Sequence, residues 1–597
     1  MTKKNENTQK LVKFKSLYHA ACEAYGETLD RLDNSLDQYL GSPIIDGSRE
    51  QANHVRNITF ELIESELSPE IPYARVDTPC YSVGAASLAE AAERLLKVTR
   101  DSLPFDEIND ADERSTYIFG GSLLFVEWER EAEKERHIPI RIRQISPRDF
   151  VPEPAVTRLE DMNYCFLRFH TTKGDIQKKY GVSDEDIILC DCGYEFGEGL
   201  SGDDSVTVIY AFYKNDEGLV SQFVFSGDIV LADIEDYYGS DTIGKSIAVS
   251  DKGEIYVENR DFANQGLQNK GKKQKRYPIE KYRPKDFPLV LRKNISADGE
   301  LLGRSDAEML RHIQQAVNKV ESRIMQKLMR SGITPIMPED AEVTLSNAIF
   351  GQVIKIKSGE SADSYGTVDT TPDISQDIEQ ANRLYDQAKR LIGISDAYQG
   401  IDFNKVESGY AKQLRINQAQ GRLQSKRRMK ILAYEKLYKI IFEHFLCFSE
   451  GVRHLSYKDG FGRVKECDFA PLKHLAFDEK KGTFFLSDDL TFTADNESGS
   501  ELTREAIWER NLKNLESGTL GDKESPKTLL RYWQLQERAR YPGAKDNVEY
   551  FRAIVEGEKG VENKAENESK SDTVNKAENE SKSDTERPLE VKSEVEV

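Results

Sequence analysis

The chain has 597 residues, a formal net charge of −21 at pH 7, and 38% hydrophobic and 31% charged residues. The length is enough for roughly three to five domains. The acidic balance excludes a tight, non-specific nucleic-acid binder, which needs clustered cations to displace counterions, but it does not exclude a channel through which DNA slides. No apolar run is long enough for a transmembrane helix, and no apolar segment follows Met1 as a secretory signal would require, so we expect no membrane partner. Seven scattered cysteines are typical of a reducing cytosol.

The first part of the chain predicts a helical arm followed by an α+β region. Residues 1–47 are polar and helical in pattern, with a weak apolar stripe at Leu11, Phe14, Leu17 and Tyr18. In residues 48–304, segments with the hydrophobic periodicity of helices are followed by segments with the alternation of strands. The expected helices lie near 55–67, 85–102 and 109–118, and the expected strands near 122–128, 138–142, 206–213 and 222–231.

The middle of the chain predicts two amphipathic helices separated by short strands. Residues 305–331 carry apolar side chains at three- and four-residue steps, and Ser305 with Glu308 forms a capping box. Residues 332–372 are strand-like, and a second helix covers 373–394. Because amphipathic helices are unstable alone, we expect both helices to pack in a bundle or a ring.

A glycine-flanked loop at 395–409 leads into a long helix at 410–449. Loops of that length between helices usually have a function. Residues 450–497 predict further strands, and residues 498–556 predict helices. An eleven-residue string occurs at 563–573 and again at 575–585, so 557–597 is an acidic repeat that we expect to be disordered.

Motifs for catalysis are weak. Residues 239–246 match a P-loop formally, but acidic residues precede the match and a β-branched segment follows it, where a phosphate site needs a helix beginning at the lysine. We therefore interpret it as a loop of a β-hairpin. Cys190 and Cys192 lack a second ligand pair for zinc, and no histidine pair or nucleophile motif is present. We expect no enzymatic activity, no cofactor and no metal.

Two groups of cations lie on the predicted helices. Arg422, Lys426, Arg427, Arg428 and Lys430 form a solvated or interface face, or pair with acids of a neighbouring subunit. The second group lies on 305–331 and 373–394, where it either lines a lumen or is solvated. Its members are Arg311, Lys319, Arg323, Lys327, Lys389 and Arg390.

Several segments occur in the order seen in one family. Residues 57–72 look like an early wing helix, 117–126 and 145–152 are similar to wing strands, and 287–290 with 303–318 look like the entry to a first stem helix. Residues 512–520 resemble crown helices. Together with the helix, loop and longer helix at 373–449, this order resembles the portal proteins of tailed double-stranded-DNA bacteriophages.

The resemblance implies a portal fold. It would comprise an N-terminal arm (1–47), an α/β wing (48–304), stem helices (305–331 and 373–394), a clip (332–372), a tunnel loop (395–409) and a long helix (410–449). Returning wing strands (450–497), a helical crown (498–556) and the tail (557–597) would follow. The residues implied for the DNA channel in the tunnel loop are Asp396, Tyr398, Gln399, Asp402, Phe403, Asn404 and Lys405, and those implied for terminase or adaptor contact in the clip are Val353, Ile354, Lys355, Ile356 and Lys357.

The implied function is a dodecameric ring at one capsid vertex of the virion, assembled in the host cytoplasm. Its partners would be other copies of the chain, double-stranded DNA, the large terminase, the major capsid and scaffolding proteins, and the neck or head–tail adaptor. Two alternatives stay open: a soluble nucleotide-dependent enzyme built around Lys245, and a scaffold or adaptor that forms no ring.

Overall fold

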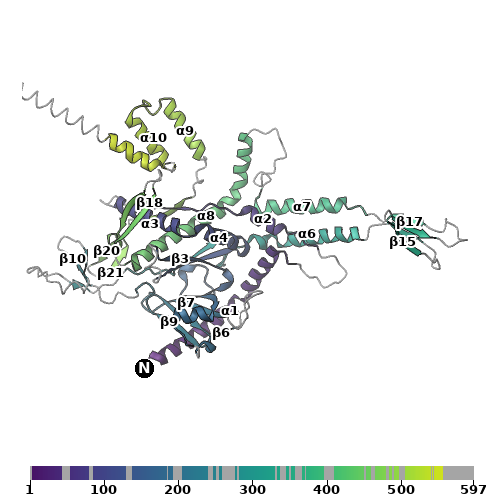
Figure 1. Cartoon of the computed structure of the whole chain (residues 1–597), viewed down its shortest axis with the longest axis horizontal. Coiled ribbons are helices and arrows are strands. Elements are labelled where there is room, and N and C mark those ends of the chain that lie inside the picture. The colour runs from purple at the N-terminus through teal and green to yellow at the C-terminus, as the bar shows by residue number, and fades with distance from the viewer. Residues whose placement is uncertain are drawn as a thin grey trace, which may run out of the picture. The chain divides into compact units, whose positions relative to one another are not determined.

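The computed structural model is a mixed α+β protein, which confirms the predicted fold class (Figure 1). It describes residues 3–42, 54–78, 85–129, 138–183, 186–192, 205–239, 246–249, 255–258, 276–277, 282–329, 333–336, 344–348, 351–355, 366–369, 372–394, 409–449, 452–458, 464–478, 483–486, 490–495, 504–538, 541 and 543–555. The chain divides into two compact units. The large unit comprises Met1–Arg453 and Phe469–Ala494, and the small unit comprises His454–Asp468 and Asp495–Val597.

A six-stranded antiparallel sheet forms one layer of the large unit. Its strands are β4 (Phe150–Pro152), β5 (Tyr164–Thr172), β7 (Ser205–Lys214), β8 (Val220–Ser226) and β9 (Ile229–Ile234) in that order, with β6 (Asp191–Cys192) paired to β7. Along β7, Val208 and Tyr210 belong to one buried cluster and Ile209 to another, because alternate side chains point to opposite faces. Helix α1 (Lys3–Leu40) covers the second face with Leu11 and Phe14, so the apolar stripe expected in the arm is confirmed as a packing surface.

The expectation of one strand at 222–231 was wrong. The segment forms two strands, β8 and β9, which turn at Gly227 with a φ of 52°. A Cβ at this position would lie 2.2 Å from the backbone oxygen of Leu189, so the turn requires glycine. Strand β5 and helix α5 (Lys173–Tyr180) were not predicted.

A second sheet has the order β13 (Leu289–Lys293), β2 (Gly121–Trp128) and β3 (Ile140–Ile145). Helices α4 (Phe105–Phe119) and α8 (Gly409–Phe448) both contact it. Helix α4 starts at Phe105, earlier than the predicted Asn109, and ends at Gly120, whose φ is 83°. Helices α2 (Ile58–Glu66) and α3 (Ala85–Ser102) lie where the hydrophobic periodicity placed them.

Helices α6 (Asp306–Met329) and α7 (Ser375–Ile392) form an antiparallel pair, called here the helical hairpin, and lie side by side in Figure 1. The Ser305 hydroxyl accepts a hydrogen bond from the backbone N–H of Glu308 at 2.9 Å, which confirms the predicted N-cap. The chain between the two helices contains two antiparallel strand pairs. They are β14 (Ile333–Ile336) with β17 (Gly366–Asp369), and β15 (Thr344–Ala348) with β16 (Gly351–Lys355).

The other strands of the large unit form small sheets: β1 (Tyr73–Asp77) with β22 (Thr491–Asp495), β10 (Ser246–Val249) with β11 (Ile255–Glu258) and β12 (Arg276–Tyr277), and β20 (Leu475–Asp478) with β21 (Thr483–Leu486). Strand β20 was not predicted. Strands β18 (Arg453–Lys458) and β19 (Val464–Phe469) form a further pair, and the small unit contains α9 (Arg504–Glu516), α10 (Pro526–Arg538) and a helix at 544–555. Within the described ranges, no helix has the length and hydrophobicity needed to cross a membrane.

Candidate functional site: a helical hairpin and the buried ion network at its base

Apolar side chains fill the interface between the two helices of the hairpin. Leu310, Ile313 and Val317 of α6 pack against Ala388 and Ile392 of α7 near the base, where α2 also contributes. A second cluster continues the interface further along both helices. The amphipathic faces therefore pack against each other within one chain, as their periodicity required.

A charged triad joins the two helices near the end of α6. Asp377, on the first turn of α7, accepts from Arg323 Nη2 at 2.6 Å and from Lys327 Nζ at 2.6 Å. The hydrogen bond from Lys327 is the largest of the effects that lower the pKa of Asp377. Two of the cations predicted to line a lumen are thus paired within the protomer.

The other cations of the hairpin differ in exposure. Lys389 is buried, and its Nζ lies 4.6 Å from the centre of the Tyr385 ring, in a cation–π arrangement. Arg311 is half-buried, whereas Lys319 and Arg390 are exposed. The cations predicted for a lumen therefore do not form a single exposed stripe.

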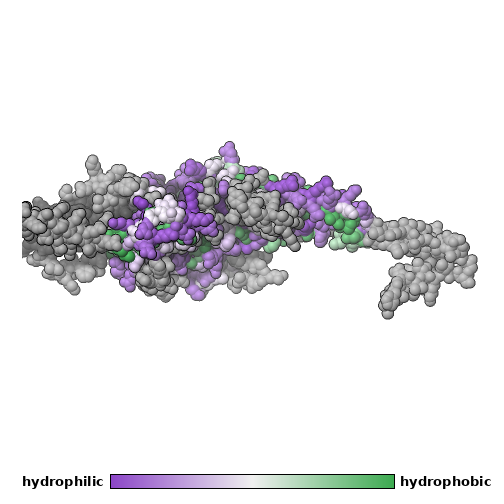
Figure 2. All heavy atoms as spheres, turned by 90° about the horizontal axis from the view of Figure 1, so that it is seen from above, coloured by the Kyte–Doolittle hydropathy of each residue, from purple (hydrophilic) through white to green (hydrophobic). Residues whose placement is uncertain are grey.

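Exposed apolar side chains also lie on the hairpin, close to the ends joined by the strand pairs. Met325, Leu328 and Met329 of α6 have relative exposures of 37%, 46% and 75%, and Ile378 of α7 is 45% exposed. Figure 2 shows hydrophobic atoms at this end of the hairpin, beside a mainly hydrophilic surface. Such a cluster on an exposed helix pair is typical of a surface covered by another protein.

Most of the residues predicted for the clip and the tunnel loop lie outside the described residues. Val353, Ile354 and Lys355 belong to β16, as their alternation indicated, whereas Ile356 and Lys357 fall beyond it. All seven tunnel-loop residues lie outside the described residues, as does the C-terminal repeat tail. Ile394, the last described residue before the loop, is buried against the base of the hairpin.

A network of buried ions lies where α4, α8 and β13 meet. Arg292 Nη1 of β13 is 2.6 Å from Asp112 Oδ2 and 2.7 Å from Glu113 Oε1, both on α4. Lys430 of α8 is 3.0 Å from the same Glu113 oxygen and donates to the backbone oxygen of Glu70 at 2.6 Å. At most 2% of each of the four charged side chains is exposed.

A second part of the network attaches α8 to the first turn of α6. Lys426 Nζ is 2.7 Å from Asp306 Oδ2 and 2.8 Å from Glu66 Oε2 of α2. Asn294 Nδ2 donates to Asp306 Oδ2 at 3.0 Å, and Lys426 Nζ lies 5.0 Å from the centre of the Tyr117 ring. Because Asp306 begins α6, this lysine links the long helix directly to the base of the hairpin.

The charges of the network balance only when one acid is neutral. Its ion pairs join three cations to four acids. Burial, and then the neighbouring Asp306 carboxylate, raise the pKa of Glu66 well above its usual value. Burial lowers the pKa of Lys426, but the carboxylates of Asp306 and Glu66 outweigh it and hold that pKa above its usual value. Burial therefore favours the neutral form of Glu66, which would offset the excess of one acid in the network.

The interpretation of 422–430 as a solvated or intersubunit face was wrong for Lys426 and Lys430, which pair with acids of their own chain. Lys426 and Lys430 lie three or four residues from the buried Leu423, Ala433 and Tyr434. Because this spacing repeats with each helical turn, all five residues lie on one face of α8. That spacing was the available signal, since a lysine inside an apolar stripe needs a buried acid. Arg428, which does not share the spacing, is exposed.

The P-loop-like segment lacks the structure that a phosphate site needs. Residues 240–245, including Lys245, lie outside the described residues. The next residues, Ser246–Val249, form strand β10, which pairs antiparallel with β11 and β12. The prediction that no helix follows the lysine is confirmed, so no helix N-terminus is available there to bind phosphate.

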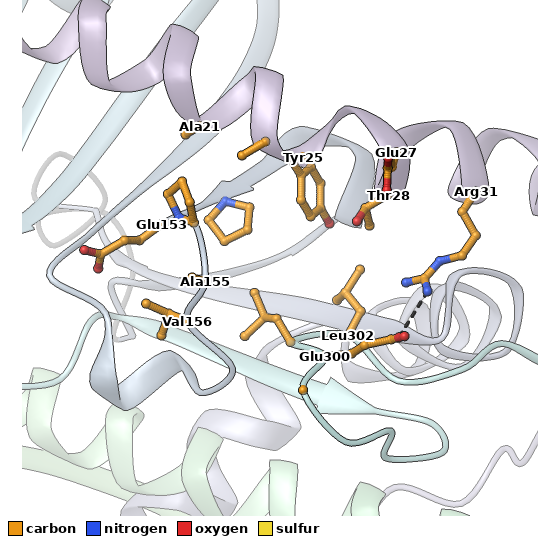
Figure 3. Close-up of a pocket in the computed structure, with 15 residues that line it drawn as sticks. Ala21, Tyr25, Glu27, Thr28, Arg31, Glu153, Ala155, Val156, Glu300 and Leu302 are labelled. Carbon is orange, nitrogen blue, oxygen red and sulfur yellow. Dashed lines mark hydrogen bonds and ion pairs between the residues drawn. The ribbon is translucent and has the colours of Figure 1, made fainter.

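Clefts also open among the described residues of the large unit. The first, of about 400 Å³, lies between α1, the turn at 152–156 and the turn at 299–302. Figure 3 shows Tyr25 and Leu302 pointing into this cleft, with the Arg31–Glu300 ion pair, at 3.0 Å, across one end. Ala155, at its edge, has a φ of 64°, which is unusual for a residue other than glycine. The second cleft, of about 440 Å³, lies beside α8.

Comparison of the sequence with protein-family models finds no match, and a search of curated proteins finds no relative.

Proposed function

We propose that this chain is the portal protein of a tailed double-stranded-DNA bacteriophage, a ring-forming channel through which the genome enters and leaves the capsid. The proposal rests on the resemblance in segment order together with the helical hairpin. The observation that carries it is the exposed apolar cluster of Met325, Leu328, Met329 and Ile378 on that hairpin. In a closed ring, hairpins of adjacent copies lie side by side, and such a cluster is then removed from water.

Two further observations support the proposal. The small strand pairs between α6 and α7 occupy the place that a clip takes in this chain order. The segment 395–408 is bounded by two anchored helices, because Ile392 packs into the base of the hairpin and Lys426 fixes α8 to α2 and α6. The helix before this segment and, further along at Lys426, the helix after it are therefore both fixed, and fixed elements of this kind can serve as the scaffold of a functional loop.

The portal proposal assigns roles by region. The ring would be dodecameric, with the helical hairpin as the stem, residues 333–369 contacting the terminase and later the adaptor, and 395–408 facing DNA in the channel. Phe403 would touch the same loop of the next subunit, and Lys405 would lie near the phosphates. One weakly held cation per subunit guides a sliding polyanion without retaining it.

The proposed channel role is tested by replacing Phe403 and Lys405 with alanine and co-expressing the variant with the capsid and packaging proteins of its own phage. Rings and procapsids should form normally, while packaged or retained DNA falls. The matched control is Lys178→Ala on α5, an exposed lysine on another part of the large unit. Failure to form procapsids would assign the loop a structural role, and unchanged DNA content would contradict the channel role.

A further inference from the structure

The second cleft, called here the α8 cleft, combines an apolar floor with a basic wall. Met429, Leu432 and Ile440 of α8 face Phe287 and Leu289 at the start of β13 across about 440 Å³. Leu432 remains 36% exposed. An apolar floor of this kind suits the side chains of a peptide segment better than a sugar–phosphate backbone, which is polar along its whole length.

Cations outnumber acids around the cleft. Its lining includes Arg158, Lys293, Lys436 and Lys439, against Glu160, Asp286 and Glu443. Lys436 pairs with Glu160 and Lys439 lies 3.8 Å from Glu443, so the excess is one positive charge when every group is ionised. Burial lowers the pKa of Lys293; Glu160 opposes this, and the nearby cations Arg158 and Lys436 add smaller lowering effects. An acid brought into the cleft would offset the effect of these cations.

One of the three acids is partly neutral at physiological pH. Glu443 is 4% exposed and accepts a hydrogen bond from the Tyr282 hydroxyl at 3.1 Å. Burial raises the pKa of its carboxyl to about 7, against the smaller opposing effect of Lys439. The cleft is therefore a net positive site on a chain whose overall charge is −21.

We infer that the α8 cleft receives an acidic, partly apolar segment of a second copy of this chain and forms one of the contacts that close the ring. The inference deepens the proposed function and rests on it. A chain with an acidic surface and a basic apolar cleft is complementary to its own copies, and a head-to-tail contact of this type can close into a ring. The electrostatic attraction adds specificity to the apolar contact made at Leu432.

The test compares three variants with the wild-type protein by mass photometry across a dilution series, at low and high salt. The double variant, Lys436→Glu with Lys439→Glu, reverses the charge of two lysines that line the cleft. Leu432→Glu changes the apolar floor and removes no ion pair found among the described residues. Arg428→Glu, an exposed position of α8 outside the cleft, is the matched control. Circular dichroism and thermal melting verify that each variant folds.

Both cleft variants should need at least about tenfold more protein for assembly, while the control assembles like wild type. Salt should weaken assembly of the wild-type protein, because it screens the attraction between the basic cleft and the acidic segment. Assembly of the double variant should not weaken with salt in this way, because that attraction has been removed. If the wild-type protein forms rings and both cleft variants form equally stable rings, the inference about the cleft is wrong, but the portal proposal still holds. A wild-type protein that never forms a large oligomer would instead overturn the portal proposal. If the wild-type protein binds a labelled DNA duplex and both cleft variants abolish this binding, the cleft binds nucleic acid. That result would contradict the inference that a second copy of the chain occupies it.

Discussion

Replacing Lys426 with methionine should loosen the attachment of α8 to the base of the hairpin. The change keeps an unbranched side chain of similar size, but it removes the ammonium that joins Glu66 to Asp306 and lies 5.0 Å from the centre of the Tyr117 ring. Removing one partner of a buried ion pair costs about 3–5 kcal/mol. We expect the lower end, about 3 kcal/mol, because burial favours the neutral form of Glu66 and Asn294 still donates to Asp306.

Hydrogen–deuterium exchange on the intact protein measures this cost locally. Since each 1.4 kcal/mol is a factor of ten, a loss of about 3 kcal/mol should speed exchange of the α8 amides after residue 426 roughly a hundredfold. Arg428→Met, at an exposed position of the same helix, should leave their exchange unchanged. Unchanged protection in the Lys426 variant would refute the reasoning about the network.

Four further perturbations have expected outcomes. Glu66→Gln should cost less than about 1 kcal/mol, because the raised pKa of Glu66 favours the neutral acid that glutamine mimics, whereas Asp306→Asn should cost about 3 kcal/mol. Equal losses in thermal stability would contradict this difference between the two acids. Wild-type stability should fall as pH rises from about 4.5 to about 7 and then level off, because the raised pKa of Glu443 makes its ionisation costly only in the folded chain. Glu443→Gln should remove that part of the slope in melting curves between about pH 5 and 8. Ala388→Pro should abolish the hairpin at a cost of roughly 3 kcal/mol in each protomer, so normal rings from this variant would mean that α7 is not a packed helix. The depressed pKa of Asp377 should stabilise the hairpin at neutral pH and lose that effect as pH falls through the acid range. The protection of α7 amides against hydrogen exchange, corrected for the intrinsic exchange rate at each pH, should lose this acid-range dependence in Asp377→Asn.

Local patterns predicted much of the helical structure. The bounds of α3 follow from its apolar spacing, and Ser305 caps α6 because a hydroxyl before an amphipathic run satisfies a free backbone N–H. Strand β16 follows from the alternation that begins at Val353, with turn residues on both sides. In each of these cases the cause lies within a few residues of the effect.

Long-range contacts were harder to predict. Gly227 divides 222–231 because Leu189, remote in sequence, approaches its backbone, and no local pattern contains that approach. The burial of Lys426 depends on acids from α2 and α6 that are brought together only by folding. The α8 cleft likewise combines segments from three parts of the chain.

The most direct test of the central claim is to image the purified full-length protein by negative-stain electron microscopy and to weigh it by mass photometry. The portal account predicts rings with a central channel and a mass near 815 kDa, which is twelve times the 67.9 kDa protomer. A ring of another copy number would change the stoichiometry alone. Monomers or small compact oligomers at every protein and salt concentration would contradict the account.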